Sequence, residues 1–157
     1  MQEQPLNLPD STILIHSQAL LRMISLSGSA LPNEACGILG GQFIDTESTR
    51  LSIETVYPIA NRATSRSFTF SFAPEEWVSA YYAMQKNRQS LVGFFHSHPT
   101  TPPIPSQADL AGMQWSSIPT YWIISLADRD ASNIAHVKVY RKAGQTWLPS
   151  MFTQISI

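Results

Sequence analysis

The chain has 157 residues, of which 43% are hydrophobic and 13% are charged. This length and composition are typical of a compact globular protein, and we expect a single domain over residues 1–157 with a core of about 12–148. The formal net charge of −1 offers no positive field to a phosphate backbone, so nucleic acid is not expected as a partner.

The remaining features of the composition concern the cellular compartment. A single cysteine, Cys36, excludes an internal disulfide bond and fits a reducing environment. The first ten residues lack the basic and apolar regions of a secretory signal, and no stretch approaches the roughly 18 apolar residues of a membrane span. We therefore expect a cytoplasmic protein without a membrane partner.

The first predicted elements are a strand, a helix and a hairpin. Residues 12–15 favour a short strand, and Ser17 is a candidate N-cap for a helix that should end near Gly28. Residues 36–44 and 49–59 alternate like an antiparallel hairpin, in which the paired glycines of the first strand indicate a bulge or a close backbone contact.

The middle of the chain continues the alternation of strands and helices. Residues 67–72 (SFTFSF) alternate with period two and favour a strand, and Pro74 with two acidic residues favours the start of a helix. Residues 91–98 favour a buried strand. The proline-rich loop 99–105 cannot be helical, and a further helix should begin at Ser106.

Strands are also predicted at 120–126 and 134–142, followed by a turn at Gly144. The element order predicts an α+β fold, in which a mixed, mostly antiparallel β-sheet is flanked by helices.

Two histidines end the predicted strand 91–98. Residues i and i+2 of a strand share a face, so His96 and His98 should present two imidazoles side by side. Catalytic zinc usually keeps three protein ligands and one open position, and Asp109 in the next helix is the candidate third ligand. As an alternative, Ser106 and Asp109 match a capping box, which is common at helix starts.

A longer pattern includes this histidine pair. An upstream Glu34 is followed by His-Ser-His-Pro at 96–99, six residues, Ser106, two residues and Asp109. The pattern resembles the JAMM motif of the MPN (JAB1/MPN) metalloprotease family, and the segments around Glu34 and before His96 are similar to that family as well. The resemblance implies the MPN fold, a cytidine-deaminase-like sandwich.

The resemblance also implies a role for each matched residue. His96, His98 and Asp109 would hold one Zn2+ per chain, and Glu34 would act on the metal-bound water as general base. Ser106 would support the developing oxyanion, in addition to or instead of capping the helix.

The short chain is most similar to the compact stand-alone prokaryotic branch of the family. This similarity implies hydrolysis of a peptide or isopeptide bond at the C-terminal tail of a ubiquitin-like or β-grasp sulfur-carrier protein that ends in Gly-Gly. The oligomeric state and the carrier stay open.

Several alternatives were weighed against this interpretation. A non-catalytic scaffold on the same fold would lose the motif side chains, which are complete here. The chain lacks the His-x-Glu and Cys-x-x-Cys ligands of zinc deaminases and the HExxH helix of other proteases. Cys36 is predicted to be a buried core residue, although it could approach the site, and His16 and His136 are predicted to be surface or core histidines.

Overall fold

The computed structural model describes residues 12–45, 47, 50–113, 116–127 and 135–156. Within these residues one eight-stranded sheet has the order β7-β6-β5-β4-β2-β3-β1-β8. The strands are β1 (Ile13–His16), β2 (Cys36–Phe43), β3 (Leu51–Ile59), β4 (Ser90–His98), β5 (Thr120–Ser125), β6 (His136–Ala143), β7 (Thr146–Ser150) and β8 (Thr153–Ile155). The helices are α1 (Ser17–Ala30), α2 (Pro74–Lys86) and α3 (Gln107–Met113).

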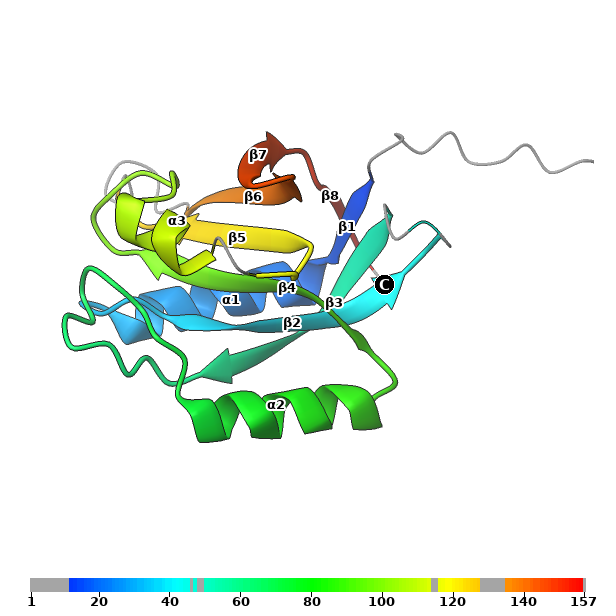
Figure 1. Cartoon of the computed structure of the whole chain (residues 1–157), viewed down its shortest axis with the longest axis horizontal. Coiled ribbons are helices and arrows are strands. Elements are labelled where there is room, and N and C mark those ends of the chain that lie inside the picture. The colour runs from blue at the N-terminus through cyan, green and yellow to red at the C-terminus, as the bar shows by residue number, and fades with distance from the viewer. Residues whose placement is uncertain (1–11, 46, 48–49, 114–115, 128–134, 157) are drawn as a thin grey trace, which may run out of the picture.

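The two longer helices cover opposite faces of the sheet. Successive residues of a strand point to opposite faces, so Phe95 and Trp122 pack in the cluster that contains α1, whereas Phe94 and Tyr121 pack in the cluster that contains α2. In Figure 1, α1 lies behind the sheet and α2 lies nearer the viewer. Strands β4 and β5 are buried on both faces over most of their length, in keeping with the unbroken apolar runs in the middle of each strand.

The hairpin prediction is confirmed. Strands β2 and β3 are antiparallel, and their register shifts between Gly40 and Gly41. A Cβ atom at Gly41 would lie 1.8 Å from the carbonyl oxygen of Ser52, so this position requires a residue without a side chain. The paired glycines therefore mark both the bulge and the close backbone contact.

We predict that Gly41→Ala destabilises the protein by about 2 kcal/mol or more, because the backbone of β3 must move to accommodate the added methyl group. The melting temperature should fall by roughly 4–8 °C. Gly112→Ala in α3 is the matched control, since a Cβ there meets nothing within 4 Å. The control should be neutral or slightly stabilising, and an equal loss of stability in both variants would contradict the steric explanation.

The predicted strand at 67–72 is wrong. Only an isolated bridge between Asn61 and Phe72 occurs there. The Asn61 side chain takes the place of a neighbouring strand, because its amide donates to the Thr69 carbonyl (2.9 Å) and accepts from the Ser71 N–H (3.1 Å). Two of the alternating phenylalanines, Phe70 and Phe72, instead line a pocket.

Three smaller predictions also need correction. The N-cap of α1 is His16, and the Ser17 hydroxyl donates to the Ile155 carbonyl at 3.1 Å without capping the helix. Helix α1 continues through Gly28 to Ala30. Strand β8 was not predicted, because three residues carry too little periodicity. None of the described helices has the length and apolar character needed to cross a bilayer.

The carboxyl ends of the parallel strands β4 and β5 meet at one edge of the fold. Helix α3 follows β4 at this edge, and the loop between β3 and α2 lies at the same end of the molecule (Figure 1). All the predicted site residues belong to segments that end or begin there.

Candidate active site

His96 and His98 lie side by side, as their spacing predicts. They are buried at the end of β4, and their Nε2 atoms are 2.9 Å apart. The sheet face to which they point is the face of Phe94, two residues earlier, which packs in the α2 cluster.

Asp109 approaches the histidines from the first turn of α3. Its Oδ2 lies 3.1 Å from His98 Nε2 and 3.4 Å from His96 Nε2. The same residue forms the capping box, because the Ser106 N–H donates to Asp109 Oδ2 (2.8 Å) and the Asp109 N–H donates to Ser106 Oγ (3.0 Å). The capping box is therefore present, and in the same conformation Asp109 Oδ2 lies beside both histidine nitrogens, with Ser106 at the edge of the cluster as the helix cap.

Glu34 joins the cluster from the segment that precedes β2. Its Oε1 lies 3.6 Å from His96 Nε2 and is buried without a hydrogen-bond partner among the described residues. The position of Glu34 near His96 depends on Ser97, the residue between the two histidines in the sequence. The Ala35 N–H donates to Ser97 Oγ (2.8 Å), and the Ser97 N–H donates to the Ala35 carbonyl (3.0 Å).

Ser97 therefore holds the Glu34 segment against β4. No role for Ser97 follows from the sequence pattern, although a hydroxyl in a fully buried strand needs a partner. We predict that Ser97→Ala lowers the turnover of the hydrolysis expected from the motif about tenfold, because Glu34 is held less firmly. This corresponds to about 1.4 kcal/mol of transition-state stabilisation. Zinc content should not change. Ser97→Thr keeps the hydroxyl and should restore much of the activity, and a Thr variant as impaired as the Ala variant would contradict this role.

The two histidine rings have different polar contacts on their second ring nitrogens. His98 Nδ1 lies 2.8 Å from the Pro102 carbonyl, which can only accept, so Nδ1 carries the proton and Nε2 of the neutral ring is a lone pair. His96 Nδ1 lies 2.5 Å from the Tyr121 hydroxyl. Tyr121 was not predicted as a site residue, because it stands in an apolar run of the sequence. The signal that could have identified it is a tyrosine in such a run, since a buried phenol usually finds a polar partner.

This arrangement fits a bound cation. Two imidazole nitrogens and a carboxylate oxygen lie 2.9–3.4 Å apart, so either protons or a bound cation must lie among their lone pairs. The ligand atoms of Glu34, His96 and His98 also fall within 4.8 Å of one another. Asp109 is nearer to both nitrogens than Glu34 is to His96, and the unpartnered Glu34 Oε1 remains available for another group. Nitrogen and carboxylate ligands are those of catalytic zinc.

The charges of the metal-free site are strongly perturbed. Burial raises the pKa of Glu34 to about 7, with the charge of His98 opposing the shift. Burial also lowers the pKa of His96. Burial works against the ionised form of Asp109, but hydrogen bonds from both histidines outweigh it and hold its pKa well below the usual range. For His98, hydrogen bonds to Asp109 and Pro102 outweigh burial, and its pKa is raised. Such clustered shifts are typical of functional sites.

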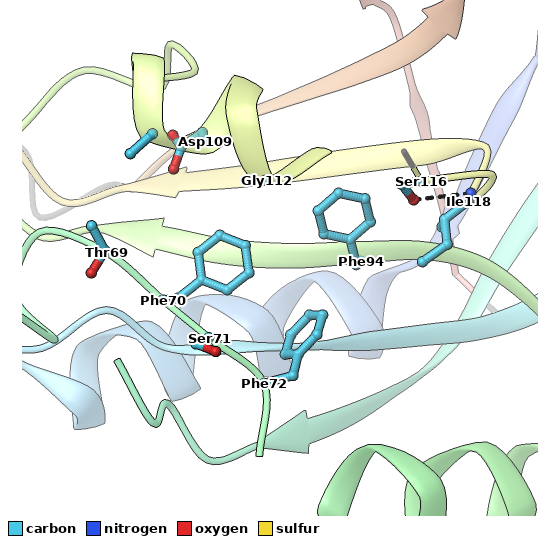
Figure 2. Close-up of a pocket in the computed structure, with 10 residues that line it drawn as sticks. Thr69, Phe70, Ser71, Phe72, Phe94, Asp109, Gly112, Ser116 and Ile118 are labelled. Atoms are coloured by element: carbon cyan, nitrogen blue, oxygen red, sulfur yellow. Dashed lines mark hydrogen bonds between the residues drawn. The ribbon is translucent and has the colours of Figure 1, made fainter. Parts of the chain in front are cut away.

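Three pockets are lined by residues of the cluster, and one of them, of about 500 Å³, is lined by Glu34 together with Cys36 and Glu76. The other two are lined by Asp109 and by Glu34 with His98. The first, of about 310 Å³, is lined by Asp109 and by the aromatic rings of Phe70, Phe72 and Phe94. Figure 2 shows the three rings facing one another below α3. The second pocket, of about 280 Å³, has Glu34, His98 and Ser106 on one side and two exposed apolar side chains on the other, Phe68 and Ile104.

Of the other residues considered in the sequence, Cys36 pairs with His96 in the sheet and lines a pocket with Glu34, whereas His16 and His136 are not among the clustered residues. Cys36 is buried, its thiol donates to the Ile59 carbonyl (3.3 Å), and burial with the nearby charge of Glu34 raises its pKa to about 12. The prediction of a core cysteine is confirmed. His16 is partly buried and His136 is exposed.

Comparison with known families supports the motif. A family model described as prokaryotic homologs of the JAB domain matches residues 16–140. The chain belongs to this family. The resemblance inferred from the sequence is therefore confirmed, and the described sheet and helices have the α+β JAB1/MPN fold.

Three curated relatives of this JAB-family chain are proteases or desampylases by name. A desampylase of Pyrococcus furiosus is 36% identical over 118 residues, covering 73% of this chain and 74% of the relative. A desampylase of Haloferax volcanii is 29% identical over 126 residues, covering 80% and 78%. A probable TtuB-protein conjugate cleaving protease of Thermus thermophilus is 29% identical over 84 residues, covering 54% and 51%.

Solved structures agree with the JAB1/MPN fold. The solution structure of a protein from Desulfitobacterium hafniense superposes with a TM-score of 0.78 at 33% identity, covering 92% of this chain and 94% of the other. The crystal structure of a JAB1/MPN domain protein from Archaeoglobus fulgidus has a TM-score of 0.55 at 17% identity, covering 92% and 99%. The second similarity is evidence of a common fold alone.

Proposed function

We propose that this chain is a zinc-dependent hydrolase, which cuts the peptide or isopeptide bond at the C-terminal tail of a ubiquitin-like, β-grasp sulfur-carrier protein. The observation that carries this proposal is the convergence of Glu34, His96, His98 and Asp109 between two pockets. The names of the relatives, which include a conjugate-cleaving protease, support a protein conjugate as substrate.

In this proposal His96, His98 and Asp109 hold one zinc ion. Their donor atoms already face one another, and the second ring nitrogen of His98 is engaged by the Pro102 carbonyl. When bound, zinc lowers the pKa of a coordinated water to about 7 and polarises the substrate carbonyl. The protein's part is to exclude competing partners and to keep the three donors in place.

Glu34 acts as general base and then as general acid. Its Oε1 has no partner among the described residues and can accept the proton released when water attacks the carbonyl carbon. Burial raises the pKa of Glu34 to about 7 in the metal-free site, and a bound cation favours its carboxylate form, which is the form that accepts a proton. Glu34 then delivers the proton to the departing amine, which leaves as a neutral amine.

Ser106 supports the oxyanion in the same proposal. Its oxygen accepts from the Asp109 N–H, so its own hydroxyl proton remains to be donated. The residue shares the second pocket with Glu34 and His98. A donor in this position contributes a few kcal/mol when the carbonyl oxygen gains charge.

The carrier tail is assigned to the side of the first pocket. Residues 69–72 run along this pocket, and none of the hydrogen bonds among the described residues uses the backbone of Phe70. An extended tail could pair with this backbone by strand addition and place an apolar side chain among the three phenylalanines. The amine side then occupies the second pocket, since Glu34 lines it and must reach the departing nitrogen.

The test uses the zinc-loaded chain and a ubiquitin-like carrier whose Gly-Gly terminus is joined to a lysine ε-amine or to an added residue. Mass spectrometry should detect the carrier released with an intact Gly-Gly end. The matched reaction with Glu34→Gln should release none above background. The test is repeated with each ubiquitin-like carrier of the same genome. If the zinc-loaded wild type cuts none of these adducts, the proposal is wrong.

A further inference from the structure

The side chain of Asn61 joins separate stretches of backbone beside the cluster. Its nitrogen Nδ2 donates to the carbonyls of Glu34 (3.1 Å) and Thr69 (2.9 Å). Its oxygen Oδ1 accepts from the N–H groups of Ala63 (3.0 Å) and Ser71 (3.1 Å). A carbonyl can only accept and a backbone N–H can only donate, so these partners determine the orientation of the carboxamide. The half-buried side chain therefore uses both its donor and its acceptor side.

The loop between β3 and α2, to which Asn61 belongs, holds the backbone of Glu34 through both of its polar groups. The Glu34 N–H donates to the Arg66 carbonyl (2.7 Å), and the Glu34 carbonyl accepts from Asn61 (3.1 Å). The following residue, Ala35, is instead bonded to β4 through Ser97. The segment that carries the proposed base is thus held on one side by this loop and on the other by the sheet.

The same loop contributes to all three pockets around the cluster. Residues 69–72 line the first pocket, to which they supply two of the phenylalanines (Figure 2). Residues 67–68 line the second pocket, and Asn61 and Arg66 line the pocket of about 500 Å³. Since Asn61 bonds to Glu34 and also to the wall of the first pocket, it connects the proposed base with the side assigned to the carrier tail.

We infer that Asn61 is a positioning residue for the proposed reaction: its carboxamide holds the backbone of Glu34 against the loop that lines the pockets, so that base and substrate keep one relative placement. The effect on turnover rests on the proposed function, whereas the contact itself does not depend on the substrate. A misplacement of about 1 Å can lower a rate on the order of 100-fold, so a bond to the backbone of the base is sufficient to matter.

The test uses two substitutions of Asn61. Asn61→Asp keeps the size of the side chain and can still accept from the Ser71 N–H, but its carboxylate cannot donate to the Glu34 carbonyl. Asn61→Ala removes both contacts and adds no charge. A loss shared by the two variants is therefore due to the missing donor.

Gln89→Glu is the matched control for Asn61→Asp. Gln89 is also a half-buried carboxamide that uses both of its ends, since its nitrogen donates to Thr55 Oγ1 (2.8 Å) and its oxygen accepts from the Tyr57 hydroxyl (2.6 Å). None of these three residues lines the pockets of the cluster. The control therefore makes the same chemical change, from amide to carboxylate, without touching the Glu34 segment.

Hydrogen exchange of backbone amides, read by NMR in the 15N-labelled proteins, tests the contact without any substrate. Both Asn61 variants should speed the exchange of the Glu34 amide roughly tenfold, because the loop that accepts this N–H is released. The Ala35 amide, which is bonded to Ser97, should keep its rate. Exchange at Ser71 should rise in Asn61→Ala alone, since the carboxylate of Asn61→Asp still accepts there.

Kinetics with a carrier adduct test the effect on the base. We expect kcat to fall about tenfold in both Asn61 variants, KM to rise only in Asn61→Ala, and zinc affinity to stay within about twofold of wild type, since Asn61 is not among the proposed ligands. Gln89→Glu should match wild type throughout.

An unchanged exchange rate at Glu34 would overturn the inference. A loss confined to KM, a loss in Asn61→Asp without one in Asn61→Ala, or an equal loss in Gln89→Glu would overturn it too, because the base would then be unaffected or the effect would be one of charge or general stability. Wild type that cuts no adduct would end the proposed function, and the exchange rate at Glu34 would still decide whether Asn61 holds this segment.

Discussion

Glu34→Gln is expected to lower kcat/KM by a factor of about 10² to 10⁴ while zinc remains bound. The substitution keeps the size of the side chain and removes its ability to accept a proton. Glu34 Oε1 is 3.6 Å from His96 Nε2, farther than Asp109 Oδ2 is from either histidine, so the three proposed ligands stay in place. This variant should therefore lose activity without losing its zinc.

The measurement is turnover of a carrier adduct together with zinc content by elemental analysis. Glu75→Gln, which removes an exposed carboxylate from α2, is the control and should behave as wild type. Equal turnover by Glu34→Gln and wild type would exclude Glu34 as the base. Loss of zinc from the variant would instead assign Glu34 to the metal.

The pH profile offers a second readout of Glu34. A general base must be deprotonated, and burial raises the pKa of Glu34 to about 7 in the metal-free site. A bound cation favours the carboxylate and lowers this pKa. The kcat/KM of wild type should therefore fall as the pH decreases below about 7, with its midpoint at or below that value, and the residual activity of Glu34→Gln should lack this acid limb.

The second large effect is expected from the proposed ligands. Asp109→Asn should weaken zinc binding more than 100-fold, beyond the loss typical of groups that only support a ligand. Asparagine can still accept from the Ser106 N–H, so the start of α3 should survive. His98→Ala should lose zinc to a similar degree, and kcat/KM should fall in both variants.

His136→Ala is the control for these variants, since His136 is exposed on β6 and is not one of the clustered residues. Zinc affinity is measured by chelator competition, and circular dichroism checks that the fold is kept. A folded Asp109→Asn protein that binds zinc as tightly as wild type would restrict Asp109 to helix capping. The metal would then have to be held by Glu34 and the histidines, whose ligand atoms also lie close together.

Local chemistry accounts for what could be predicted without a structure. The spacing of His96 and His98 on a strand, and of Ser106 and Asp109 at a helix start, depends on backbone periodicity alone. The glycine pair in β2 indicated a bulge for the same reason. These features involve residues within a few positions of one another, and the structure has each of them.

The failed prediction of a strand at 67–72 shows where local reasoning ends. An alternating run of phenylalanines has the same sequence pattern whether it pairs with a neighbouring strand or lines a pocket. The segment does not pair as a strand because the Asn61 side chain hydrogen-bonds to the backbone of Thr69 and Ser71. No periodicity within 67–72 contains that information.

The sequence by itself determined the family, the order of most elements and the set of residues that resemble a metal site, because these depend on residue type and short spacing. The tertiary structure decided how the set is assembled. It brought Glu34 within 3.6 Å of His96, made Ser97 the link to the Glu34 segment and placed the Tyr121 hydroxyl on His96. These contacts join residues 25 to 62 positions apart, so they depend on strand order and register, which pair segments that the chain itself keeps distant.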